Sequence, residues 1–289
     1  MKNKIISLLL LPVVFCQLLC SCYSPRYLYS PVAHNVPVLV QKGDSKIAFQ
    51  YSNTIGEKAK VTTLAKESNG IGIDVQGAYA VTNHFAVQAG YAHRSEQNFA
   101  EFNINSNDTS IINYNRHFSE LGIGYYTFLN ENQRVIFQVF GGAGFGKSSF
   151  TDVYQTVGNP IHKRFLNVDV TKLYLQPALM VRYQDFFATS ISSRVSVIYF
   201  RNVTTDYSAE EIKSYQLKTL GTGTEIFWEP AFVNTFGFKK LPGLRFELQL
   251  GMAFLLSEQF VDYRTFNLSA GLVLDFPKLF SGRESGVKN

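Results

Sequence analysis

The sequence predicts an all-β protein, a transmembrane antiparallel up-and-down β-barrel of about ten strands, with eight or twelve as the alternatives. First, apolar and polar residues alternate with a period of two over most of the 289 residues. Second, short and long connections follow one another in turn. Third, one face of the predicted strands is apolar, whereas the other carries charges. Charged residues make up 17% of the chain, which is below the roughly 25% of average soluble proteins.

The stretch 117–147 shows the pattern most clearly. Leu121, Ile123 and Tyr125 share one face, the polar break 130–133 follows, and Val135 then starts a second alternation. Two alternating runs joined by a short turn predict a β-hairpin. Each run is long enough for a tilted strand that crosses a bilayer, which needs about 9–11 residues.

The same alternation predicts strands along the chain after Asp44. They are expected at 45–53, 70–81, 85–94, 117–129, 134–146, 170–183, 187–200, 216–229, 244–257 and 265–276. A barrel domain is therefore expected over 44–276, followed by a C-terminal tail at 277–289.

The predicted connections differ in length at the two ends of the barrel. Short turns are expected at 82–84, 130–133 and 184–186, and long polar loops at 54–69, 95–116, 147–169, 201–215 and 258–264. Short turns on one side and long loops on the other are typical of outer-membrane barrels. The segment 230–243 is an exception at the short-turn end, and its phenylalanines and lysines suit the membrane surface.

The two predicted faces differ in chemistry. The inward face is expected to carry Asp74, Gln76, Gln88, Arg94, Gln138, Lys172, Gln176, Arg182, Arg194, Glu225, Arg245, Glu247, Gln249 and Asp275. Outward aromatic residues are expected in two belts: Tyr79, Phe85, Tyr125, Tyr183, Phe187, Trp228 and Phe276 near the short turns, and Tyr51, Tyr91, Phe145, Tyr199 and Phe266 at the other end. A soluble β-sandwich or lipocalin-like barrel is the alternative. Paired charges are expected to fill the narrow lumen.

The N-terminus has the features of a secretion signal. Lys2 and Lys4 precede an apolar run at 5–15, and a signal peptide is predicted over 1–21. The segment ends Leu19-Cys20-Ser21-Cys22, which resembles a bacterial lipobox and implies a covalent diacylglycerol and acyl chain, such as palmitate, on Cys22. An ordinary cleaved signal is the alternative. Proline-rich residues 22–43 are expected to form a lipid-anchored periplasmic linker, part of which tucks against or into the barrel.

Together, the lipobox, residues 35–39 before Lys42-Gly43-Asp44, and the alternating strands resemble outer-membrane β-barrel lipoproteins common in Bacteroidota. The resemblance implies a bacterial outer-membrane location and a lipid anchor. Surface-exported members usually carry an acidic signal after the cysteine, whereas Tyr23-Ser24-Pro25-Arg26 follows here. This difference implies an anchor on the periplasmic side.

One nucleotide-binding motif is matched by residues 141–148, which read GxxxxGKS. A phosphate loop needs a helix after it, and the sequence predicts none. We therefore expect a strand, in which the glycines from Gly141 to Gly146 make room near the barrel wall, and no nucleotide site.

No catalytic motif, metal site or cofactor is predicted, because the five histidines lack metal-ligand spacing. His93 with Glu96, and His117 with Glu120, are the candidates for a hydrolase at the rim. We favour the interpretation that both pairs are solvated residues at the rim without a catalytic role. The mild net charge of +5, with scattered basic residues, argues against nucleic acid.

The function favoured by the sequence is that of a non-catalytic structural, binding or assembly component of the outer membrane. Its long loops 95–116 and 147–169 would contact a protein partner. A narrow solute channel is the second hypothesis, and the rim hydrolase is the third.

Overall fold

Eleven strands lie in one antiparallel sheet in the computed structural model, and the sheet closes on itself. The structure describes residues 26–54, 68–101, 109–155, 158, 160–183, 186–215, 217, 220–238, 240–257 and 261–276. The strands are β1 (Ser45–Asn53), β2 (Ser68–Ala80), β3 (Phe85–Glu101), β4 (Thr109–Phe128), β5 (Val135–Gln155), β6 (His162–Tyr183), β7 (Phe187–Thr205), β8 (Thr224–Phe238), β9 (Leu241–Met252), β10 (Phe254–Leu255) and β11 (Phe266–Leu274). The short helix α2 spans Ala209–Ser214.

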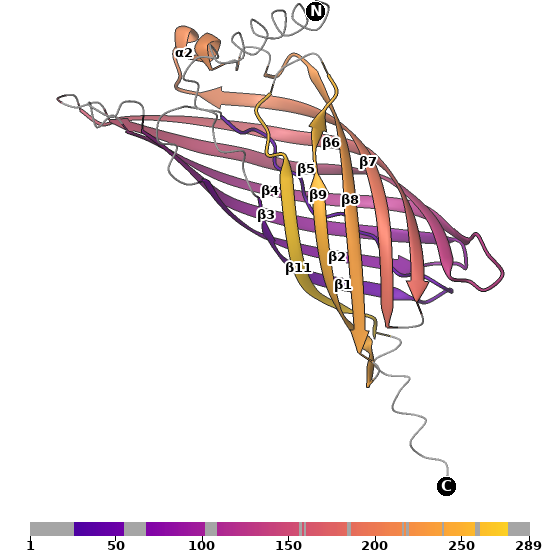
Figure 1. Cartoon of the computed structure of the whole chain (residues 1–289). Helices are drawn as coiled ribbons and strands as arrows, with labels where there is room; N and C mark the ends of the chain where they lie inside the picture. The colour runs from indigo at the N-terminus through magenta and orange to yellow at the C-terminus, as the bar shows by residue number, and fades with distance from the viewer. Residues whose placement is uncertain are drawn as a thin grey trace, which may run out of the picture.

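The sheet closes because β1 pairs with both β2 and β11, while β9 pairs with both β8 and β11. β10 continues β9 along β8 in the same register, so β9 and β10 together count as one strand of the barrel. The predicted closed antiparallel barrel of ten strands is confirmed. Figure 1 shows α2 at the end of the barrel opposite the one where β8 ends.

The outward face is apolar around the middle of the barrel, as predicted. Ile123 and Leu121 are 73% and 68% exposed, although both are large hydrophobic residues. Exposed apolar side chains in this number are stable only against lipid or a partner. All the predicted inward polar residues except Arg182 are buried.

Along a single strand, the chemistry of the two faces reverses. In β6 the outward Leu173, Leu175 and Leu179 are exposed, and the inward Lys172 and Gln176 are buried. Further toward the long-loop end, the inward residues become Leu166, Val168 and Val170, while Asn167 and Asp169 face outward. The reversal marks the edge of the apolar belt, beyond which β6 is built like part of a water-soluble protein.

The belt has the thickness of a bilayer core. From Leu173 to Tyr183, β6 rises about 33 Å along the strand, or about 25 Å along the barrel axis at a tilt near 40°. Tyr91, Phe145 and Tyr199 face outward at its long-loop edge. No helix among the described residues is long and apolar enough to cross a membrane.

Several predicted strand boundaries were wrong. β7 continues to Thr205, into the loop expected at 201–215, and the strand expected at 216–229 begins at Thr224. Strands β3 to β6 take up most of 95–116 and 147–169, which were predicted as loops, because their outward polar residues lie beyond the belt and still pair in register. β8 runs to Phe238 and turns directly into β9, so 230–243 is no surface loop. Consequently, Trp228 lies opposite Val195 rather than near the short turns.

Candidate functional site: a plugged barrel lumen

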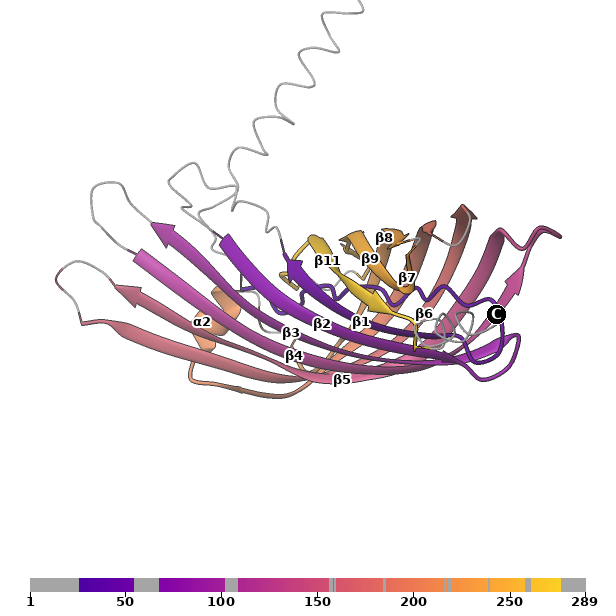
Figure 2. The ribbon, with the colours of Figure 1, turned by 90° about the horizontal axis from the view of Figure 1, so that it is seen from below.

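The lumen is occupied by the protein's own N-terminal segment, residues 26–40, which we call the plug. Nearly all of its residues are buried, and Figure 2 shows this indigo segment running within the curve of the sheet. The periplasmic linker predicted for 22–43 is therefore, in its described part, mostly inside the barrel. Only residues near 41–43 emerge, at a turn where Gly43 donates to the carbonyl of Ala80 at 2.9 Å.

The plug is extended and, apart from an isolated bridge between Tyr29 and Tyr263, has no neighbouring strand along its described length. Buried backbone groups nevertheless need partners. Four glutamines from β2, β5, β6 and β9 supply them in place of a strand. Gln76 donates to the carbonyl of Ala33 (2.9 Å), Gln138 to that of Pro37 (3.3 Å), and Gln176 to that of Asn35 (2.9 Å), while Gln249 accepts from the N–H of His34 (2.8 Å).

A layer of charges surrounds the first residues of the plug. Arg26 pairs with Asp152, which also accepts a hydrogen bond from the hydroxyl of Tyr207 at 2.8 Å. Glu96 pairs with Arg116 and lies 3.6 Å from Arg264. The hydroxyls of Ser30 and Thr54 complete this site by donating to Glu96, at 2.9 and 2.7 Å. Burial, followed by the nearby Asp152 carboxylate, raises the pKa of Tyr207, so this hydroxyl stays protonated and able to donate.

A second charged layer lies in the middle of the lumen. Glu120 pairs with Lys172 and lies 3.5 Å from a guanidinium nitrogen of Arg194. Arg194 also donates to Oε1 of Gln176, at 2.9 and 2.6 Å, so one guanidinium connects the ion pair to the plug's support. Further toward the short turns, Lys46 pairs with Glu247 at 3.0 Å. The predicted filling of the lumen by paired charges is confirmed.

Apolar clusters close the lumen on both sides of the charged middle. Near the short turns, Val36 and Leu39 of the plug pack among Tyr126, Phe140 and Met180. Near the long loops, Tyr27, Leu28 and Tyr29 belong to a larger cluster with residues such as Tyr114 and Phe150. The described part of the plug is therefore fixed at both ends by hydrophobic contacts, and between them by hydrogen bonds.

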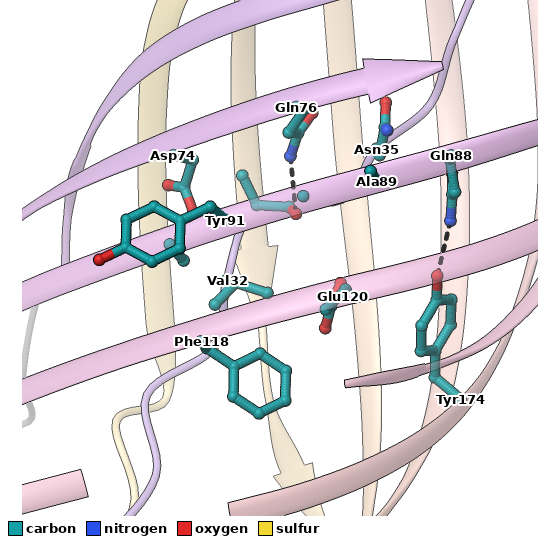
Figure 3. Close-up of a pocket in the computed structure, with 13 residues that line it drawn as sticks. Val32, Asn35, Asp74, Gln76, Gln88, Ala89, Tyr91, Phe118, Glu120 and Tyr174 are labelled. Carbon is teal, nitrogen blue, oxygen red and sulfur yellow. Dashed lines mark hydrogen bonds between the residues drawn. The ribbon is translucent and has the colours of Figure 1, made fainter. Parts of the chain in front are cut away.

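A small cavity remains beside the plug (Figure 3). Val32 and Asn35 of the plug line it, together with Asp74, Gln76, Gln88, Phe118, Glu120 and Tyr174 from the wall. The side-chain oxygens of Asn35, Gln76 and Gln88 have no hydrogen-bond partner among the described residues. Buried oxygens of this kind suit ordered water. Both carboxylates are already paired, Asp74 with Arg94 at 2.8 Å and Glu120 with Lys172.

The predicted rim pairs do not come together. His93 and His117 face each other across β3 and β4 on the outward face, whereas Glu96 and Glu120 lie on the inward face. In a strand, residues three apart point to opposite sides, so neither histidine shares a site with its carboxylate. Among the described residues, no cluster of histidine, aspartate and glutamate could hold a metal ion.

The GxxxxGKS motif lies inside β5 and pairs with β4 and β6 throughout. It is therefore a strand, as expected, and no helix N-terminus meets it. The inward Gly142, Gly144 and Gly146 form a flat strip against which Phe118 and Tyr174 pack. Cys22 lies outside the described residues.

Sequence reasoning did not place the following charges in the lumen, all of which are buried there: Arg26, Glu96, Arg116, Asp152, Glu229 and Arg264. Several fell in stretches assigned to loops. The alternation was the available signal, since Arg116 lies at an even position of its strand and therefore on the face opposite to the apolar Leu121 and Ile123.

These features define a transmembrane β-barrel of the outer-membrane class with an internally plugged lumen. The chain matches no protein-family model and no curated protein.

Among solved structures, the chain is similar to the outer membrane protease OmpT from Escherichia coli, with 11% identity and a TM-score of 0.44, covering 84% of this chain and 99% of that one. It is also similar to the translocator domain of the autotransporter NalP from Neisseria meningitidis, with 13% identity and a TM-score of 0.43, covering 84% and 90%. The COG4313 outer membrane channel from Pseudomonas putida F1 shows 9% identity and a TM-score of 0.42, covering 84% and 100%. At these identities, no activity carries over to this chain.

Proposed function

We propose that this protein is a non-catalytic, lipid-anchored component of the bacterial outer membrane with a structural, binding or assembly role. The observation that carries the proposal is the plug, because a lumen filled by the protein's own chain serves stability rather than passage. The N-terminal lipobox supports an acyl anchor on Cys22, of the kind found in the Bacteroidota lipoproteins that the sequence resembles.

A narrow solute channel is the second candidate, and the cavity beside the plug is the one feature that favours it. Opening a path would require the plug to leave its four glutamine partners and the Arg26–Asp152 pair. Each buried polar group left without a partner costs about 1–3 kcal/mol. The combined free-energy cost of these unpaired groups makes a steadily open lumen unfavourable.

A rim hydrolase is the third candidate and has no support from the geometry. Its two histidines point away from the carboxylates that would orient them. A base and its orienting group must lie within hydrogen-bond reach.

A protein partner would meet the long-loop end. There, β3 to β7 rise beyond the belt and present outward polar residues such as Asn115, Ser149 and Asn167. Together with α2, these strands form a broad surface in place of the two loops expected from the sequence. Loops and rims carried on a rigid scaffold are common sites of recognition.

Planar-bilayer conductance of the refolded protein tests the closed lumen. We expect no steady current at several salt concentrations, because the plug fills the path. Replacing Gln76, Gln176 and Gln249 together by leucine should destabilise the plug and produce brief openings. Gln97→Leu is the matched control, since Gln97 is exposed on the outward face.

Steady conductance of the unsubstituted protein would instead establish the channel. If the folded triple variant conducted no more current than Gln97→Leu, the glutamines would not be what holds the plug.

The lipid anchor has a separate test. Cys22→Ser should abolish fatty-acid labelling, and retained label would refute the anchor.

A further inference from the structure

The plug runs through the lumen in one direction, and this limits which side of the membrane the residues before it can reach. At the long-loop end, the N–H of Arg26 donates to Asp262 at 2.7 Å, and the N–H of Leu28 donates to the carbonyl of Asp262 at 2.7 Å. Asp262 belongs to the connection between β10 and β11. At the other end, Gly43 contacts Ala80 beside the short turn between β2 and β3. The chain thus runs through the lumen from the long loops to the short turns, and then enters β1.

The height of Arg26 above the apolar belt follows from its partner on β5. Phe145 is the last outward aromatic residue of the belt on this strand, and Lys147 follows it on the same face. From Phe145 to Asp152 the strand rises about 23 Å, or about 18 Å along the barrel axis. The guanidinium of Arg26 therefore lies about 18 Å outside the hydrocarbon core, on the long-loop side.

Cys22 stands four residues before Arg26, and four residues of fully extended chain reach at most about 14 Å. The headgroup layer on each side of a bilayer core is about 5–8 Å thick. Cys22 can therefore reach the headgroups on the long-loop side. The headgroups at the short-turn end lie beyond a belt of about 25 Å, far outside its reach.

We propose that the lipid on Cys22 enters the outer leaflet, on the same side as the long loops, so that the tether of this lipoprotein passes through its own barrel. The inference rests on the proposed lipidation of Cys22. It reverses the periplasmic anchor expected from the missing acidic residues after the cysteine. On this side of the barrel, β1 ends at Asn53, two residues past the outward Tyr51, and β11 begins at Phe266, four residues after Asp262.

Single-cysteine labelling of intact cells tests the leaflet. Once the signal is removed and Cys22 carries lipid, the mature chain offers no free thiol. A membrane-impermeant maleimide should therefore leave the unsubstituted protein unlabelled. Ser24→Cys adds one thiol beside the anchor without changing the length of the tether.

Two described positions calibrate the two sides. Lys213→Cys places a thiol on exposed α2 at the long-loop end, and Lys240→Cys places one at the exposed turn between β8 and β9. We expect Ser24→Cys to label in intact cells to the same extent as Lys213→Cys. Lys240→Cys should label only after the outer membrane is permeabilised. If Ser24→Cys behaves like Lys240→Cys, the proposal is overturned.

Fatty-acid labelling of the Cys22→Ser variant separates this inference from the proposed function. If that variant keeps its fatty acid, the anchor assignment fails, and with it the lipid part of the inference. Labelling of Ser24→Cys would still report the side on which the chain emerges.

Discussion

At the residue scale, the close contact between β4 and β5 depends on glycines on the inner face of β5. A Cβ added at Gly142 would lie 2.1 Å from the carbonyl oxygen of Leu121 and 2.7 Å from the hydroxyl of Tyr174. At Gly146 it would lie 2.1 Å from the carbonyl oxygen of His117. Backbone atoms cannot rotate away, so close approach of the two strands requires glycine at these positions.

Gly142→Ala and Gly141→Ala form a matched pair of adjacent substitutions. The outward Gly141 has no atom closer than 3.7 Å to an added Cβ. We expect Gly142→Ala to lower the free energy of unfolding by about 1–3 kcal/mol, as overpacking does, and Gly141→Ala to leave it nearly unchanged. Urea unfolding of the refolded barrel, followed by tryptophan fluorescence, measures both. Equal midpoints for the two variants would contradict the role given to Gly142.

The sequence could predict this strip, but not what packs on it. A period of two assigns each glycine to a face from its immediate neighbours alone. Which side chains fill the space depends on strands far away in the chain, such as β6 with Tyr174. For the same reason, the inward face of the charges was predictable, whereas the pairing of Glu120 with Lys172 was not.

At the element scale, α2 is a six-residue helix held by its first turn rather than by burial, since none of its residues is buried. Ser208 and Glu211 form a reciprocal capping box, and Nε of Arg164 on β6 lies 3.3 Å from Oε1 of Glu211. Partial desolvation of Glu211 tends to raise its pKa, but hydrogen bonds from Ser208 and the interaction with Arg164 outweigh it and lower the pKa.

Acid should therefore release α2. Because the pKa of Glu211 is lower in the folded protein, its stabilising effect is complete above the unfolded value of about 4.3 and is lost as the pH falls through the folded pKa. An environment-sensitive dye on Lys213→Cys should report this release only at a pH below the unfolded value. Glu211→Gln should remove this transition, because a neutral amide does not titrate.

Glu210→Gln is the control for the α2 experiment. It lies in the same first turn but takes no part in the capping box, so it should keep the transition of the parent. A transition that persists in Glu211→Gln would assign the release to another group.

Elements that reverse their pattern were the hardest to predict. Beyond the belt, β3 to β6 turn polar side chains outward, and this composition resembles a loop although the strands continue. The plug posed a different difficulty. Its prolines correctly excluded a ladder strand, but four glutamines on four separate strands supply its backbone partners. Such a match exists only in the folded protein.

At the scale of the whole molecule, the barrel has two sections along its axis that differ in which face is polar. The belt section is apolar outside and polar inside, whereas the long-loop section is polar outside and encloses an apolar cluster together with the buried charges around Arg26. A soluble barrel would show the second arrangement throughout, so the depth of individual residues separates the two alternatives left open by the sequence. The chain contains one tryptophan, which serves as a natural probe.

Trp228 faces outward on β8, 41% exposed, and stacks on Phe254 with ring centroids 5.3 Å apart. Its partner Val195 lies below the belt edge at Tyr199, by about 10 Å along the barrel axis. In vesicles, its emission should therefore be blue-shifted and strongly quenched by lipids brominated on their acyl chains. Aqueous iodide should quench it weakly.

A second single-tryptophan protein, combining Trp228→Phe with Lys213→Trp, moves the probe to α2 outside the belt. There, iodide should quench strongly and brominated lipid weakly. If iodide quenched Trp228 as strongly as the probe on α2, the indole would lie in water, and the soluble alternative would return. If Trp228 lay at the headgroups, lipids brominated near the carbonyl groups would quench it most strongly. That is the depth expected if β8 ended at residue 229, as the sequence suggested. Depth-resolved quenching thus tests the membrane setting and the corrected strand boundary with the same residue.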